Sequence, residues 1–178
     1  MTLLAWLLVV LAVLLVAAVV VLVTTRARRL DRLHVRIDAA RTGLEAACER
    51  RANAALAVAD VLAGLAGERE RAAGVRAAAL GVRAERVGDG DREVAENALT
   101  RELAAVPRGP LPPDVRAELE EAEQLLVIAR RVYNDAVRDT RDLRSRRLVR
   151  WLHLAGTAPM PTYFEIADPG PGVTTAAR

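Results

Sequence analysis

Polar side chains are absent from the start of the chain between Leu3 and Val23, which reads LLAWLLVVLAVLLVAAVVVLV. As an α-helix this run spans about 31 Å, the thickness of the hydrocarbon core of a bilayer. A cleaved signal peptide fits less well, because no basic residue precedes the run, the run is longer than the apolar region of a signal, and no A-x-A site follows. The pattern therefore predicts a transmembrane anchor over residues 1–25.

The charges that flank this anchor predict its orientation. No basic side chain precedes the apolar run, whereas arginines follow it at Arg26, Arg28, Arg29, Arg32 and Arg36. Basic residues are enriched on the cytoplasmic side of membranes. We therefore expect a single-pass protein of the cell membrane, with its N-terminus outside and its C-terminal body in the cytoplasm.

Beyond the anchor, apolar residues recur every seven positions in two rows, which together we call the seam. The first row is Leu30, Ile37, Leu44, Val58 and Leu65, and the second is Leu33, Ala40, Ala47, Ala54 and Val61. Only Arg51 interrupts the seam, which is typical of a helix in a coiled coil or bundle. No proline occurs before Pro107, so we expect the anchor helix to continue until Gly64 and Gly67 end it.

Three further helices are expected, over residues 68–87, 92–106 and 114–155. Asp114 is predicted to cap the last helix. Its apolar row is Val115, Leu119, Ala122, Leu126, Ala129, Tyr133, Ala136 and Leu143. The cytosolic part of the first helix (24–66) and the last helix are each about 40 residues long, roughly 60 Å, and the other two are about half that.

These lengths predict an all-α fold. The N-terminal transmembrane helix is expected to continue into an antiparallel up-down four-helix bundle with two long and two shorter helices. The expected organisation is an anchor (1–25), a helical bundle (26–156), and a proline-aromatic segment followed by a disordered tail (157–178). The seam leaves a coiled-coil dimer between two copies open as an alternative.

Composition adds little that is specific to a function. All 26 basic residues are arginine, 23 acidic residues are interspersed among them, and the net charge is only +3. The basic pI of 9.9 is therefore no sign of nucleic-acid binding, and we expect no nucleic-acid partner. Cys48 is the only cysteine, so it can form neither a disulfide within the chain nor a metal cluster.

Basic and aromatic residues gather near the predicted end of the last helix. In an up-down bundle this end returns to the membrane, so we expect a surface that contacts anionic headgroups, at about 1 kcal/mol per arginine. Together with the arginines beside the anchor, its residues are Arg26, Arg28, Arg29, Arg144, Arg146, Arg147, Arg150 and Trp151. The alternative is a solvated basic helix end, with Trp151 tucked into the bundle.

Three segments resemble the LemA family. They are RRVYNDAV (Arg130–Val137), LHVRIDAARTGLEAACERRA (Leu33–Ala52, with the pair Arg50-Arg51) and the ending APMPTYFEI (158–166). The chain departs from the family pattern in the alanine-rich stretch after Arg51 and in the shortened middle, so it is similar to a divergent member. The resemblance implies an antiparallel helical bundle on a membrane anchor, and it implies no reaction.

Residue patterns of known catalytic and cofactor sites are absent from the sequence. It contains no P-loop, no dinucleotide-binding fingerprint and no G-x-S-x-G elbow. His34 and His153 stand far apart without ligand-like neighbours. We therefore expect no enzyme, no cofactor and no metal site. Arg51, Tyr133 and Asn134 are interpreted as structural polar residues, with Tyr133 in a helix interface, Asn134 bonded to a neighbouring helix or loop, and Arg51 paired with Asp135 or Asp139.

Two functions remain. The first is a membrane-anchored scaffold or adaptor that contacts a membrane or cytoplasmic protein, with a homo-oligomer possible in principle. The second is a protein of the membrane surface that binds or organises anionic lipid through its arginines and C-terminal aromatic residues.

Overall fold

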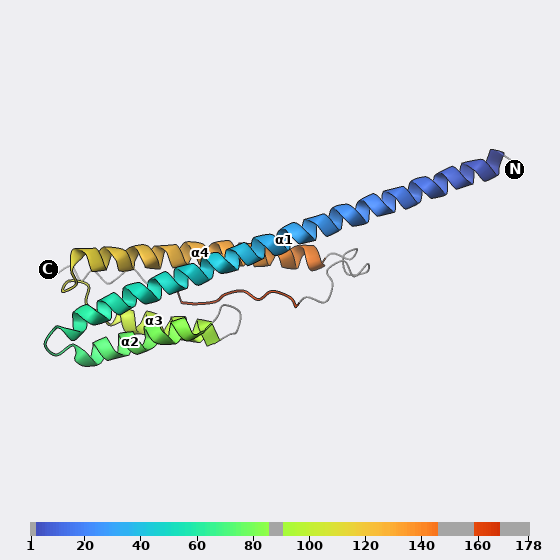
Figure 1. The fold of residues 1–178 in the computed structure, drawn as a ribbon. Coiled ribbons are helices and arrows are strands. Elements are labelled where there is room, and N and C mark those ends of the chain that lie inside the picture. Colours follow the sequence, from blue (N-terminus) through green and yellow to red (C-terminus); the bar gives the residue numbers. More distant parts are fainter. Residues whose placement is uncertain (1–2, 86–90, 146–158, 168–178) are drawn as a thin grey trace, which may run out of the picture. The chain divides into compact units, whose positions relative to one another are not determined.

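The structure is a computed structural model that describes residues 3–85, 91–145 and 159–167, without the side chains at positions 4, 26, 27 and 29–31. All regular structure in these ranges is α-helix, which confirms the all-α part of the prediction. The helices are α1 (Leu3–Ala63), α2 (Arg69–Ala84), α3 (Asp91–Ala104) and α4 (Pro113–Ser145). Figure 1 shows them in chain order, followed by the non-helical segment 159–167.

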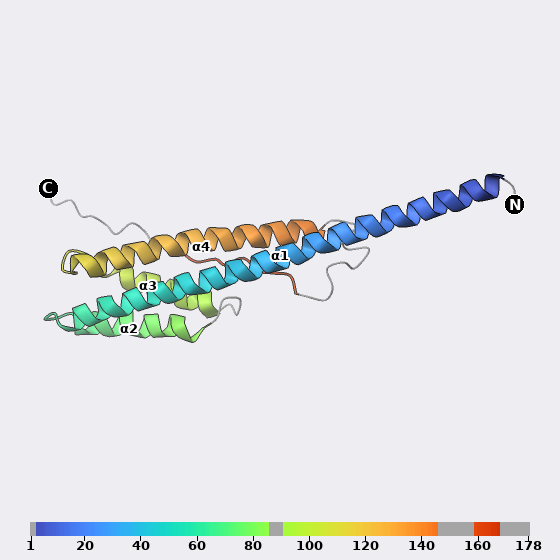
Figure 2. The same ribbon diagram turned by 45° about the horizontal axis from the view of Figure 1, so that its top comes forward.

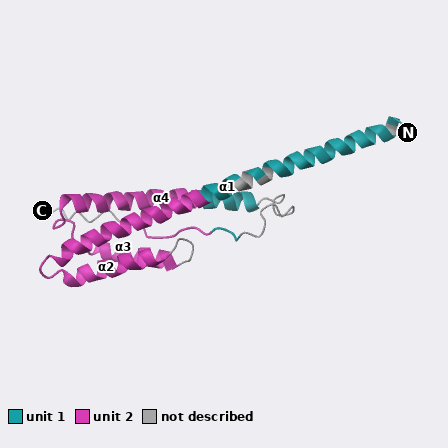
Figure 3. Cartoon of the chain, viewed as in Figure 1, with its two compact units in different colours: residues 1–37, 136–161 teal, residues 38–135, 162–178 magenta. Residues whose placement is uncertain are grey.

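The chain divides into two compact units, which Figure 3 distinguishes by colour. Unit 1 comprises residues 1–37 and 136–161, and unit 2 comprises residues 38–135 and 162–178. Helices α1 and α4 each contribute residues to both units.

Helix α1 runs for 61 residues without a break. It ends where the backbone of Gly64 bonds back to Val61 and where Gly67 takes a positive φ of 81°, a conformation that glycine adopts without steric cost. The prediction that the helix continues past the apolar run and stops at these glycines is confirmed.

The N-terminal part of α1 is apolar and long enough to cross a membrane. The segment Ala5–Thr25 has 21 residues, about 31 Å of helix, and none of it is buried in the protein. At its end the hydroxyls of Thr24 and Thr25 donate to backbone carbonyls of the preceding turn, including that of Val21 at 3.1 and 2.8 Å. This back-bonding satisfies polar groups that would otherwise be costly at the edge of a bilayer.

In unit 2, the buried face of α1 is wider than the predicted seam. Its buried residues are Leu44, Ala47, Cys48, Arg51, Ala52, Ala54, Ala55, Val58, Ala59 and Leu62. They fall on four different positions of the seven-residue repeat, with three or four buried in each repeat, whereas a two-stranded coiled coil buries mainly two. Such a face is typical of a helix with several neighbours, and most of its small residues are alanines that allow close packing.

Helix α2 runs antiparallel to the end of α1, as two ion pairs show. Arg76 pairs with Asp60 at 2.7 Å and Arg83 pairs with Glu49 at 2.8 Å, so the residue numbers rise along α2 as they fall along α1. Helices α2 and α3 lie side by side in both ribbon views (Figures 1 and 2). At their contact the Glu102 carboxylate of α3 lies over Gly74 of α2, where a Cβ atom would come within 2.6 Å of Glu102 Oε2 and would require that side chain to move.

Helix α4 begins one residue earlier than predicted, at Pro113, so Asp114 lies inside its first turn and the prediction that Asp114 caps the helix is wrong. Proline suits the first helical position because that position needs no N–H donor. The Arg116 amide then donates to the Pro112 carbonyl at 3.0 Å. The predicted end at Ala155 lies outside the described residues.

Six of the eight residues in the predicted apolar row of α4 are buried, and Val115 and Ala129 are half-buried. The buried residues along the helix are Leu119, Ala122, Leu126, Tyr133, Ala136, Val137, Thr140 and Leu143. The Thr140 hydroxyl donates to the Ala136 carbonyl at 2.8 Å, which satisfies a polar group within this face. In unit 1, Asp139 on α4 pairs with Arg36 on α1 at 2.7 Å.

Candidate functional site

A buried ion pair joins α1 to α3. The Arg51 and Glu96 side chains are both 0% exposed, and Arg51 Nη1 lies 2.8 Å from Glu96 Oε2. Arg51 Nη2 also donates to the Thr100 hydroxyl at 2.9 Å. Charges taken out of water in this way are strongly destabilising unless they are paired, so each partner here depends on the other.

A second arginine shares the same carboxylate. Arg92 is 4% exposed, and its Nε lies 3.7 Å from the other oxygen of Glu96, Oε1. Arg92 also donates to the Glu85 carbonyl. Two guanidinium groups therefore face one carboxylate, and we call Arg51, Arg92, Glu96 and Thr100 the buried charge cluster. Among the described residues, Nε of both arginines and Oε1 of Glu96 have no hydrogen-bond partner.

The partner of Arg51 differs from the sequence-based suggestion. We suggested Asp135 or Asp139, but Arg51 pairs with Glu96, and Asp139 pairs with Arg36. That suggestion was wrong because heptad spacing places Arg51 on the core face without stating which neighbouring helix lies opposite. A signal for the true partner was present: Arg92, Glu96, Leu99 and Leu103 follow the spacing of four and three that marks a buried helix face.

Cys48 lies one turn before Arg51 and is fully buried. Burial raises the pKa of the Cys48 thiol far above its ordinary value, and the negative charge of Glu96 raises this pKa further. Arg92 lowers the pKa, but by less than the other causes raise it. The thiol is therefore neutral at physiological pH, and it lacks the thiolate character that nucleophilic or redox chemistry requires.

A second polar arrangement binds the non-helical segment that follows α4. We call residues 162–167 the tail segment. Phe164 and Ile166 are buried while Tyr163 and Glu165 are exposed, which is the alternation expected of an extended chain. The tail segment therefore presents two apolar side chains inward and leaves its backbone groups to be satisfied by its neighbours.

Side chains of α4 satisfy part of that backbone. The Asn134 amide donates to the Phe164 carbonyl at 3.1 Å and accepts from the Phe164 amide at 2.8 Å. The Tyr133 hydroxyl donates to the Thr162 carbonyl at 3.1 Å, and Arg130 donates to the Ile166 carbonyl at 3.2 Å. Asn134 thus makes the same two hydrogen bonds to the Phe164 backbone that a residue of a neighbouring β-strand would make.

Side chains of α3 satisfy the other edge of the tail segment. The Glu165 amide donates to Glu93 Oε1 at 3.1 Å, and the Ala167 amide donates to Asn97 Oδ1 at 2.8 Å. We call Glu93, Asn97, Arg130, Tyr133 and Asn134 the tail-binding groove. Sequence reasoning missed Glu93 and Asn97, which stand four residues apart on one face of α3.

Two of the three segments on which the expected resemblance to the LemA family rests therefore contact each other. Tyr133 and Asn134 belong to RRVYNDAV, and Thr162 to Ile166 belong to the APMPTYFEI ending. Tyr133 is buried and Asn134 bonds to a non-helical segment. The arrangement bonds backbone amides and carbonyls of an extended segment, which is how proteins recognise a peptide backbone.

The residues predicted to contact the membrane are only partly described. The Arg28 side chain is exposed on α1 just after the apolar segment. Arg144, in the last turn of α4, donates to the Pro159 carbonyl at 2.9 Å. The side chains of Arg26 and Arg29, and residues Arg146, Arg147, Arg150 and Trp151, lie outside the described part of the chain.

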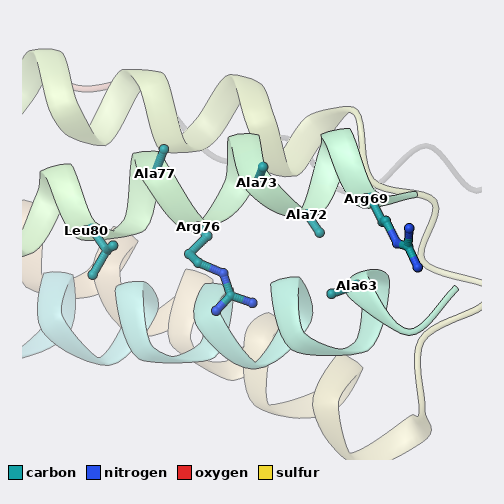
Figure 4. A pocket seen from close by; sticks show the side chains of 7 residues that line it. All are labelled: Ala63, Arg69, Ala72, Ala73, Arg76, Ala77 and Leu80. Atoms are coloured by element: carbon teal, nitrogen blue, oxygen red, sulfur yellow. The ribbon is translucent and has the colours of Figure 1, made fainter. Parts of the chain in front are cut away.

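A shallow depression of about 340 Å³ lies where α2 meets the end of α1 (Figure 4). It is lined by Ala63, Arg69, Ala72, Ala73, Arg76, Ala77 and Leu80. Of its two arginines, Arg76 already pairs with Asp60. Within residues 3–85, 91–145 and 159–167, no three His, Cys, Asp or Glu side chains come together to hold a metal ion.

No protein-family model, curated protein or solved structure matches this chain. The buried charge cluster and the tail-binding groove are therefore interpreted from their own geometry.

Loss of the shared carboxylate is expected to be the most damaging change in the buried charge cluster. Glu96→Gln should lower the free energy of unfolding by about 3–5 kcal/mol, because it leaves two buried guanidinium groups without an anion. Arg51→Met should cost less, because Glu96 keeps Arg92. Urea unfolding of the detergent-solubilised chain, followed by circular dichroism, measures both. The matched control is Glu121→Gln, which removes the exposed pair with Arg50 and should change stability by at most about 1 kcal/mol. Equal effects at Glu96 and Glu121 would contradict this account.

The buried thiol predicts a loss of stability in alkali. The unfolded chain releases the Cys48 proton near the ordinary pKa of 9.0, whereas the folded chain keeps it. Stability should therefore be unaffected by Cys48 below pH 9. Above pH 9 it should fall by about 1.4 kcal/mol per pH unit relative to a Cys48→Ala variant. Parallel unfolding free energies for the two proteins between pH 8 and 11 would show that the thiol titrates normally.

Asn134 is predicted to hold the tail segment. In Asn134→Asp the carboxylate still accepts from the Phe164 amide but cannot donate to the Phe164 carbonyl, at a cost of about 1–3 kcal/mol. Hydrogen exchange of residues 162–167 should become roughly tenfold faster or more. The control is Asn53→Asp on the exposed face of α1, which should leave this exchange unchanged. Identical exchange in both variants would show that Asn134 does not hold the tail segment.

Proposed function

We propose that this protein is a membrane-anchored helical scaffold that acts through protein–protein contacts. The observation that carries the proposal is that one unbroken helix, α1, contains both a segment able to cross a bilayer and, from Leu44 to Leu62, the widest buried face in unit 2. The same helix that is suited to insert into lipid is thus also suited to organise a folded body. Such a molecule holds binding surfaces at a membrane and needs no chemistry of its own.

The body of the scaffold is proposed to be an up-down four-helix bundle. Four sets of contacts in unit 2 support this: α1 with α2 through Arg76–Asp60, α2 with α3 around Gly74, α1 with α3 through Arg51–Glu96, and α1 with α4 through Arg50–Glu121. The two shorter helices, α2 and α3, follow α1 in turn through short connections, as in up-down bundles.

The chain is further proposed to be a divergent LemA-like protein. The support is that the tail segment binds to Tyr133 and Asn134, so two of the three segments that suggested the resemblance form one structural feature. Under this proposal the bundle and its bound tail segment are what the family resemblance describes, and no reaction is implied.

Exposed apolar side chains on α4 offer a contact surface for the scaffold. Ile128 and Val132 lie one turn apart and are 57% and 49% exposed. Apolar pairs of this kind gain free energy when a partner covers them. A partner helix or loop that brings its own apolar residues would fit such a surface.

The second candidate is a protein of the membrane surface that binds anionic lipid. Its support is the exposure of Arg28 and Arg32, which follow the apolar segment of α1 within about two turns. Arg144 favours it less, because its guanidinium group donates to the Pro159 carbonyl.

Membrane topology is tested by cysteine accessibility. With Cys48 replaced, reporter cysteines are placed near Met1 and near Arg178. We expect an impermeant reagent added to intact cells to label the N-terminal cysteine and not the C-terminal one, because the arginines after the apolar segment favour the cytoplasm. Labelling of the C-terminal cysteine from outside would place the body in the cell envelope and would exclude contact with cytoplasmic lipid.

The scaffold itself is tested by a pull-down of the full chain from mild detergent, compared with an Ile128→Glu/Val132→Glu variant. A specific protein that is retained by the wild type and lost from the variant is the expected result. The matched control replaces Val94, another exposed apolar residue, with glutamate. Repeated failure to retain any protein, together with salt-sensitive binding of residues 24–178 to anionic liposomes, would favour the lipid-binding function instead.

A further inference from the structure

The first half of α3, residues 91–98, is held in unit 2 through charged side chains. The buried residues of this half are Arg92 and Glu96, and the first buried apolar residue of this described helix is Leu99. The apolar residue Val94 does not help, because its side chain is 67% exposed. The first half of α3 therefore lacks the apolar burial that stabilises the second half.

Charged contacts of this kind cost less to open than apolar ones. Opening an apolar contact returns area to water at about 25 cal/mol per Å², whereas charged groups that separate regain the hydration that they lost on burial. Segments with few buried apolar contacts open at a lower free energy than the whole fold. Through its own contacts alone, the first half of α3 should therefore open more readily than the second half.

The tail segment makes two hydrogen bonds to this half of α3. The Glu165 amide donates to Glu93 Oε1 at 3.1 Å, and the Ala167 amide donates to Asn97 Oδ1 at 2.8 Å. Alternate amides of an extended chain are about 6.6 Å apart, and side chains one helical turn apart are separated by about 6 Å. The two spacings match, so the backbone of the tail segment runs along this face of α3.

The tail segment is also fixed to α4 of the same chain. Asn134 bonds both the amide and the carbonyl of Phe164, and Arg130 bonds the Ile166 carbonyl. The Phe164 and Ile166 side chains are buried, so the tail segment brings apolar burial to the side of α3 that contributes only charged groups. Contacts that α3 lacks are thus supplied by a segment held on α4.

The first half of α3 covers the only cysteine of the chain. Cys48 on α1 is fully buried, and Glu96 and Arg92 both act directly on its thiol. Movement of this half away from α1 would admit water to Cys48 and to the buried charge cluster. Reaction of Cys48 with a thiol reagent therefore reports the opening of residues 91–98.

We propose that the tail segment is a latch for the first half of α3. While the latch is bound, this half stays closed over α1. When the latch is released, the half opens and water reaches the buried charge cluster. The inference goes beyond the proposed function, because this equilibrium exists whether or not the chain is a scaffold. A molecule that captured the tail segment would change the surface of unit 2 by this route.

The experiment measures the rate at which a maleimide labels Cys48 in the detergent-solubilised full-length chain at pH 7. The buried thiol is neutral and inaccessible, so it reacts only after opening. Two substitutions at Glu93 form a matched pair, because both remove the same charge. Glu93→Gln keeps an acceptor for the Glu165 amide, and Glu93→Ala removes it.

The latch predicts that Glu93→Ala is labelled about fivefold faster than Glu93→Gln, because one hydrogen bond to the tail segment is lost. Helix propensity alone predicts the opposite order, since alanine favours a helix more than glutamine does. Phe164→Ala should accelerate labelling by about tenfold or more, because it removes the larger apolar anchor of the latch. Adding Glu93→Ala to Phe164→Ala should then change little, because the released latch no longer needs its acceptor.

Hydrogen exchange of the same variants separates local opening from general loss of stability. The latch predicts faster exchange in residues 91–98 than in residues 99–104 when Phe164 is replaced.

Three results would overturn the proposal. Labelling of Glu93→Ala no faster than that of Glu93→Gln would show that the bond to Glu165 does not hold α3. Independent, multiplying effects of Glu93→Ala and Phe164→Ala would show that the two residues do not act through one latch. Equal acceleration of exchange in residues 91–98 and 99–104 would show that the tail segment stabilises the whole fold instead. The scaffold proposal is decided separately, by the pull-down at Ile128 and Val132.

Discussion

The buried ion pair between Arg51 and Glu96 is the constraint on which the packing of unit 2 depends. The surrounding face of α1 consists mainly of alanine, with valine and leucine, and small side chains of similar size allow helices to pack in more than one register. A shift of one turn would separate the guanidinium group of Arg51 from Glu96, which keeps Arg92, and would leave the buried charge of Arg51 without its carboxylate. The pair therefore contributes less to net stability than to the choice of one arrangement over its neighbours.

The tail segment is likewise held in place by specific polar contacts. Here polar side chains on two helices satisfy the backbone of a chain that forms no regular structure, and Asn134 alone bonds both the amide and the carbonyl of Phe164. Backbone N–H and C=O groups near an apolar interface need hydrogen-bond partners. The segment can therefore lie against the helices only where polar side chains provide them. Recognition of an extended peptide is thus already built into the molecule, which agrees with a function based on protein contacts.

The scaffold proposal rests on the position of the apolar segment and of the buried helix face in the chain. A segment without polar side chains precedes a helix face rich in alanine, and the two belong to one helix. In the proposed scaffold, the anchor would hold these surfaces at the membrane, and specificity would come from the tail-binding groove and from exposed apolar pairs such as Ile128 and Val132. The neutral thiol of Cys48 fits this account, because burial beside Glu96 raises its pKa and keeps it unreactive.

Local periodicity along the chain was enough to predict several features of this structure. The apolar run, the continuation of α1 to Gly64 and Gly67, the helical fold class and the inward position of Arg51 could all be read from spacing, because 3.6 residues per turn fix which side chains share a face. The packing of the helices was needed to show that Glu96 rather than Asp135 or Asp139 pairs with Arg51, and that Glu93 and Asn97 join Asn134 around the tail segment. Such contacts depend on which faces of distant segments meet, and periodicity within one helix carries no information about its neighbours.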